Sequence, residues 1–110
     1  MIINLTPHPV TICNADGQVI RKIPPTAPAA RVGSTVRVIG DVDGIPVTRT
    51  EFGQVENLPE PQAGVVYIVS LLVQQACPER TDLLRPDTGP QNVVRSPDGQ
   101  IAGVKALAAL

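Results

Sequence analysis

The sequence predicts an α+β fold that is mainly β, in which antiparallel hairpins form a rolled sheet or small barrel with one short helix. Hydrophobic residues make up 43% of the 110 residues and aromatic ones only 2%, so the core is built from aliphatic, often β-branched side chains, which favour strands. Three Asp-Gly turns each separate two β-rich runs, and only one segment has helical spacing. The length predicts a single domain over residues 1–110.

Each Asp-Gly turn is predicted to close an antiparallel hairpin. Glycine after aspartate supplies the positive φ that a tight reversal needs, and runs separated by so few residues pair antiparallel. The proline-rich stretches 24–30 and 57–64 are predicted surface loops, because proline lacks the amide that a ladder needs. The hairpins join residues 9–13 to 18–23 through 14–17, residues 36–39 to 45–50 through 40–44, and residues 92–95 to 101–107 through 96–99.

The most apolar segment of the chain, Val65–Val69, is predicted to be a central strand. It lacks the apolar/polar alternation of a half-exposed strand, so we expect it to be covered on both faces. Ser70 follows as the natural N-cap of a short helix over residues 71–77. The apolar positions of that helix, 72, 73, 76 and 77, form one face, which we expect to pack on the sheet.

Composition and charge argue against several classes of function. The net charge is −1 and the nine basic residues are scattered, and the chain has only one Tyr, one Phe and no Trp, which predicts no nucleic-acid partner. The chain shows no leader pattern and no stretch approaching ~20 apolar residues, so we expect no membrane partner and a cytoplasmic location. Cys13 and Cys77 lack the close spacing of a zinc site and are predicted to be buried free thiols.

Arginine placement indicates a binding site for a small anion. Seven of the nine basic residues are arginines, and Arg31, Arg37 and Arg49 fall in or beside predicted strands. A guanidinium group grips phosphate or carboxylate at two points. Strand alternation predicts that Arg37 and Arg49 share the face away from the core. His8 lies between two prolines that preset its direction, which suits either a ligand contact or an internal hydrogen bond.

The sequence contains no recognisable catalytic, metal-binding or cofactor motif. Asp41 and Asp43 lack the further acids of a calcium loop and are predicted to be turn residues, and the glycines form no phosphate-binding loop. We therefore predict no catalytic residue, no metal and no cofactor. A catalytic site that uses His8, Asp43, Glu51 or a cysteine remains an alternative, because the groups of such a site meet in space rather than in sequence.

Four segments of the chain carry a family resemblance: Asn4–Val10, Ala30–Val32, Gly53–Pro61 and Tyr67–Ser70. They resemble a family of small uncharacterised proteins of bacterial genomes, prophages and phages, with the similarity running over nearly the whole chain. The resemblance implies a bacterial or phage accessory role and transfers no catalytic or binding residue. Small phage proteins of this kind include inhibitors that sequester nucleotide signals of host defence, usually as oligomers whose interfaces form the pockets; this link is an analogy.

Three functions follow as alternatives. The first is a non-enzymatic protein, expected to be a homo-oligomer, that binds a small anionic or nucleotide-like ligand through His8, Arg31, Arg37 and Arg49 and sequesters an antiphage signal. The second is a protein-binding or structural module that acts through exposed strand edges. The third is a small hydrolase or transferase that uses His8.

Overall fold

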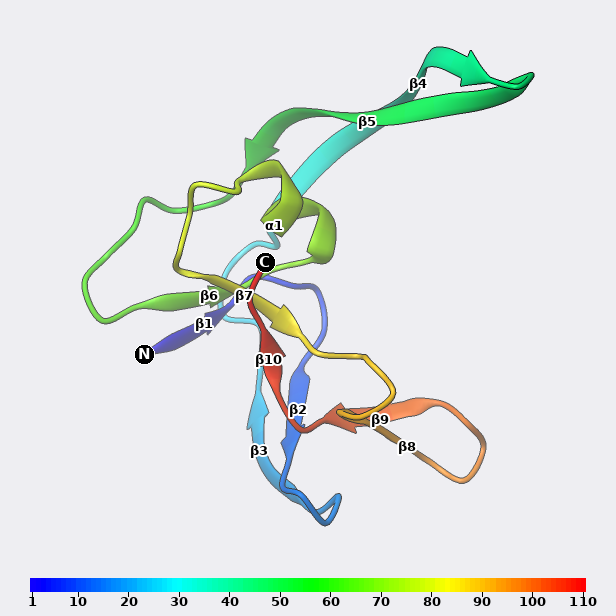
Figure 1. Cartoon of the computed structure of the whole chain (residues 1–110). Helices are drawn as coiled ribbons and strands as arrows, with labels where there is room; N and C mark the ends of the chain where they lie inside the picture. Colours follow the sequence, from blue (N-terminus) through cyan, green and yellow to red (C-terminus); the bar gives the residue numbers. More distant parts are fainter.

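The computed structural model describes residues 1–110 and has ten strands and one short helix (Figure 1). This confirms the α+β class with a dominance of strands. The elements in chain order are β1 (Ile2–Asn4), β2 (Val10–Cys13), β3 (Val19–Ile23), β4 (Arg31–Val42), β5 (Ile45–Glu56), β6 (Val66–Ile68), α1 (Leu71–Ala76), β7 (Leu83–Pro86), β8 (Val93–Arg95), β9 (Ile101–Val104) and β10 (Leu107–Ala108).

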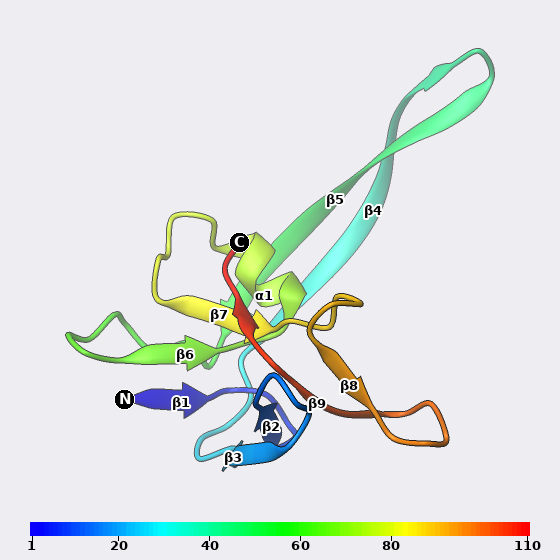
Figure 2. The same ribbon diagram turned by 60° about the horizontal axis from the view of Figure 1, so that its bottom comes forward.

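The strands form three separate sheets rather than a closed barrel. One sheet has the order β1-β6-β7-β10, a second has the order β3-β2-β9-β8, and the third contains only β4 and β5. The expected barrel is absent because the second hairpin pairs with itself alone and runs away from the other sheets (Figures 1 and 2). The outer edges of β4 and β5 therefore pair with no other strand, and no barrel closes.

All three predicted hairpins are present, and the second is longer than predicted. β2 pairs with β3 and β8 pairs with β9, both antiparallel. β4 and β5 each run for 12 residues, and only Asp43 and Gly44 remain as the turn, instead of residues 40–44. Both turn residues have positive φ, 53° and 80°, which is the requirement of a two-residue type I′ turn.

The predicted central strand is confirmed as β6, which lies between β1 and β7. Both of its pairings are parallel, a feature that the sequence did not predict. Tyr67, Ile68 and Val69 are buried and belong to two aliphatic clusters, one under α1 and one against β2 and β3. The core therefore sits where the two four-stranded sheets meet, and only the base of the β4–β5 hairpin reaches it, through Val32 and Val55.

Helix α1 begins after Ser70, whose Oγ accepts a hydrogen bond from the Val73 amide at 3.3 Å, as predicted. Its buried face differs from the predicted one, because Leu72 is exposed and Gln74 is buried instead. Gln74 Nε2 donates to the carbonyl oxygens of Leu83 and Ala108, both at 3.1 Å. The polar side chain of Gln74 therefore joins the helix to β7 and β10. The apolar pattern alone had predicted that Leu72 would be the buried residue.

Asn4 connects three parts of the body. Its side chain is fully buried, and its Nδ2 donates to the carbonyl oxygens of His8 at 2.8 Å and Ile23 at 2.9 Å. Its Oδ1 accepts from the amide of Thr6 at 2.9 Å and from the Thr6 hydroxyl at 2.7 Å. One amide group thus fixes the end of β1, the turn into β2 and the end of β3.

We expect Asn4→Ala to lower the free energy of unfolding by about 3 kcal/mol, because the buried Ile23 carbonyl and Thr6 amide would lose their partner. Urea denaturation followed by circular dichroism measures the change. Gln54→Ala, on an exposed residue of β5, serves as the matched control and should change stability by less than about 0.5 kcal/mol. An Asn4→Ala protein as stable as the control would contradict this role.

Candidate functional site

The β4–β5 hairpin, residues 31–56, forms an arm that projects from the body made by the rest of the chain (Figures 1 and 2). The Cα radius of gyration is 16.4 Å, whereas a compact chain of this length has about 13 Å. From Gly33 to Val47 every residue is exposed. The arm is therefore the part of the molecule most available for contact.

The ladder of the arm places Arg37 directly opposite Arg49. Their neighbours Val36 and Val38 pair with threonines and lie on the other face, because side chains alternate along a strand. The prediction that Arg37 and Arg49 share a face is confirmed. We call these two residues the arginine pair.

The arginine pair is only partly neutralised. Arg37 Nη1 lies 3.3 Å from Glu51 Oε1, and these side chains are 68% and 45% exposed. The only other ion pair in the structure joins Arg80 to Asp82, so Arg49 has no acidic partner. Like charges directly opposite each other disfavour the ladder, and a bound anion would relieve that repulsion.

A hollow of about 380 Å³ adjoins the arginine pair toward the base of the arm. It forms where the ladder register shifts, between Val32 and Ser34. Thr35 and Glu51, which are opposite each other in the ladder, contribute to it. The lining residues are Gly33, Ser34, Thr35, Glu51, Phe52 and Gly53.

The structure does not bring the other two predicted ligand-binding residues to the arginine pair. Arg31 begins β4 opposite Glu56, six residues from Arg37, which is about 20 Å along a strand. His8 lies in the loop between β1 and β2 with an exposed side chain, and its carbonyl oxygen accepts the bonds from Asn4 and Thr6. Neither residue lines any of the four hollows of the structure.

The residues considered for catalysis are dispersed. His8 lies on the body, Asp43 lies at the tip of the arm, and no group of three or more His, Cys, Asp or Glu residues is placed to hold a metal ion. Cys13 and Cys77 are buried free thiols, as predicted. Burial, and secondarily the nearby Glu79 carboxylate, raise the pKa of the Cys77 thiol above its usual value. Cys77 therefore stays protonated at neutral pH and is a poor nucleophile.

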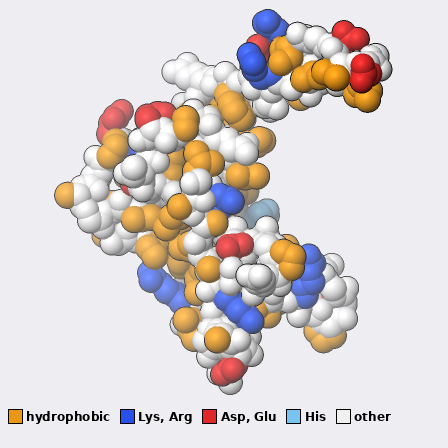
Figure 3. Space-filling view, viewed as in Figure 1, with side chains coloured by type: hydrophobic (Ala, Val, Ile, Leu, Met, Phe, Trp, Pro, Cys, Tyr) orange, Lys and Arg blue, Asp and Glu red, His pale blue; other side chains and the backbone are white.

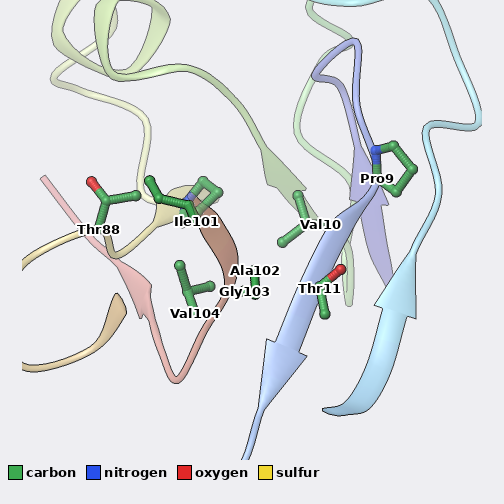
Figure 4. Close-up of a pocket in the computed structure, with 9 residues that line it drawn as sticks. Pro9, Val10, Thr11, Thr88, Ile101, Ala102, Gly103 and Val104 are labelled. Carbon is green, nitrogen blue, oxygen red and sulfur yellow. The ribbon is translucent and has the colours of Figure 1, made fainter. Parts of the chain in front are cut away.

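Three hollows of the body were not predicted, and two of them combine residues from both ends of the chain. One of about 290 Å³ lies between β2 and β9 and is lined by apolar and hydroxyl side chains, including Val10, Thr11 and Ile101 (Figure 4). It contains no charged residue. The other, of about 380 Å³, lies beside β3 and has Arg21 and Lys105 among its lining residues. Each of these two hollows is lined by residues more than eighty positions apart in the chain, so a local sequence pattern cannot predict it.

Comparison with known proteins adds no relative: no family model, no curated protein and no solved structure matches this chain. No helix in the structure has the length and apolar character needed to span a membrane. The candidate site therefore rests on geometry and chemistry alone.

We expect both cysteines to resist iodoacetamide in the native protein at pH 7.5, because each thiol is buried and the pKa of Cys77 is raised. Mass spectrometry of the intact protein should show no added label under native conditions and two labels in urea. Rapid native labelling of Cys77 would contradict this assignment and would revive a cysteine-based enzyme.

Proposed function

We propose that the protein is a non-enzymatic, cytoplasmic binding protein that holds a small anionic, nucleotide-like ligand at the arginine pair of the arm. The single observation that carries the proposal is the direct juxtaposition of Arg37 and Arg49, of which only Arg37 has an acidic partner, Glu51. The resemblance to phage and prophage proteins favours a nucleotide signal of antiphage defence as the ligand.

The chemistry of the arm suits phosphate groups. Two guanidinium groups on one face offer several N–H donors to one or two phosphates, and charge-assisted bonds of this type are the strong ones. In the adjoining hollow, Thr35 lies on the same face of the arm as the arginine pair and supplies a hydroxyl group, whereas Ser34 and Phe52, which are opposite each other in the ladder, lie on the other face. Only Glu51 opposes an anion there, and it is engaged by Arg37.

Non-catalytic binding is favoured over hydrolysis or transfer. The single histidine lies on the body, and both thiols are buried. Around the arginine pair the arm presents cations, hydroxyl groups and one carboxylate, which is paired with Arg37; these groups bind and orient an anion.

Isothermal titration calorimetry with ADP and with inorganic pyrophosphate tests the proposal. We expect both probes to bind, and Arg37→Gln or Arg49→Gln to weaken binding about tenfold, because each removes charge-assisted hydrogen bonds. Glu51→Gln should strengthen binding, since it removes the one competing negative charge. Affinity should fall with added salt, as expected for exposed charges.

Arg31→Gln is the matched control, because it removes an exposed arginine of the same strand that lies opposite Glu56. It should leave both affinities within about twofold. Mass spectrometry of the recovered ADP should show it unchanged. Absence of binding, equal losses in all three arginine variants, or recovery of a cleaved nucleotide would each overturn the proposal.

A further inference from the structure

The arm exposes an amount of aliphatic surface that is unusual for an isolated chain. Only 15 of the 110 residues are buried, and six of the thirteen exposed large hydrophobic residues lie on the arm. Val42 and Ile45 are 61% and 67% exposed and lie opposite each other at the last step of the ladder. An exposed apolar group of this kind, with polar residues around it, marks an interaction surface.

Charge is divided along the arm. Asp41 and Asp43 lie at its tip, next to the Val42–Ile45 step, while the arginine pair lies nearer the body. Figure 3 shows the same division, with acidic side chains at the far end of the arm and basic ones behind them. Neither aspartate has an ion-pair partner. The tip is therefore an aliphatic step flanked by two free carboxylates.

The hollow beside β3 has the complementary composition. Its apolar lining consists mainly of Ile2, Ile12, Ile20, Ile23 and Leu107, and its two charged residues are Arg21 and Lys105. Both basic side chains are exposed and neither has an ion-pair partner. We call this the isoleucine hollow. The isoleucine hollow has an aliphatic floor and a basic rim. It is therefore complementary to the tip, which has an aliphatic pair and two acidic residues beside it.

The arm cannot reach the isoleucine hollow of its own chain. β3 lies at the opposite end of the molecule from the tip in both views (Figures 1 and 2). The longest extent of the molecule is 49 Å. Only another copy can bring a tip and a hollow of this kind together.

We propose that the tip of the β4–β5 arm docks in the isoleucine hollow of a second copy of this chain. A two-fold pair satisfies both tips and both hollows, because a two-fold contact is made twice. It lays each arm along the partner's body.

The area suffices for a stable contact. An arm about 33 Å long and about 10 Å wide covers roughly 330 Å² on the surface beneath it. When both arms do so, about 1,300 Å² is buried in total, within the range of specific interfaces. The contact needs neither guanidinium group, but Ile45 and Arg49 are four residues apart on β5, so the Val42–Ile45 step and the arginine pair share one face of the arm.

Charge reversal on the two surfaces tests this contact in the full-length protein. We expect the wild-type chain to be dimeric in sedimentation and native mass spectrometry at low salt. Asp41→Lys places a base at the tip, and Arg21→Glu places an acid at the hollow, so each variant alone opposes like charges and should raise the dissociation constant at least tenfold.

An equal mixture of the two variants should associate again. In a mixed pair the tip altered by Asp41→Lys faces the hollow altered by Arg21→Glu, and the unaltered tip faces the unaltered hollow, so both contacts regain opposite charges. Native mass spectrometry distinguishes this mixed pair by its mass. Glu79→Lys, which reverses an exposed acid outside both surfaces, is the matched control and should dimerise as wild type does.

Three results would overturn the proposal: a monomeric wild-type chain at hundreds of micromolar, variants that dimerise like the control, or a mixture that stays monomeric. Capture of a different protein or a peptide by the arm, with no self-association, counts among the overturning results. Failure here would leave ADP binding at the arginine pair untouched, because that site lies within one arm. Measuring the dimer of Arg37→Gln separates the two proposals, since this variant should lose ADP affinity and should keep the tip and the hollow unchanged.

Discussion

The buried amide of Asn4 is the constraint on which the body depends. Its two donors and one acceptor oxygen are all used, and their partners come from the end of β1, the turn into β2 and the end of β3. A buried polar group is stabilising only when its hydrogen bonds are complete, so this arrangement fixes one relative placement of the two four-stranded sheets. It also determines where the His8 loop lies, through the backbone and not the imidazole ring.

The body and the arm have different physical roles. The body holds the aliphatic clusters around Tyr67 and Ile68. The arm has no third strand, and beyond its base, where Val32 and Val55 pack on the core, no layer covers it. A two-stranded ribbon by itself is only marginally stable in water. Its exposed valines and isoleucines, its opposed arginines and its acidic tip cost stability in isolation, and this is the composition expected of a surface completed by a ligand and by another copy.

Local sequence patterns predicted the strands, but they did not predict which distant strands pair. The Asp-Gly turns predicted all three hairpins, and the unbroken apolar run predicted β6, because both signals are contained within a few residues. Alternation placed Arg37 and Arg49 on one face for the same reason. The parallel pairing of β6, the burial of Gln74 in place of Leu72, and the isoleucine hollow depend on residues far apart in the chain. Of the four residues predicted to bind an anion, Arg37 and Arg49 are therefore adjacent in the structure, whereas Arg31 and His8 lie elsewhere.

Hydrogen–deuterium exchange of the wild-type protein across a dilution series tests most directly whether the arm is a docking element. Amides of β4 and β5 should be protected at high protein concentration and should lose that protection on dilution, while those of β2 and β6 keep theirs at every concentration. Arm amides that exchange at one rate throughout the series would contradict the account, because the arm would then gain nothing from a second copy.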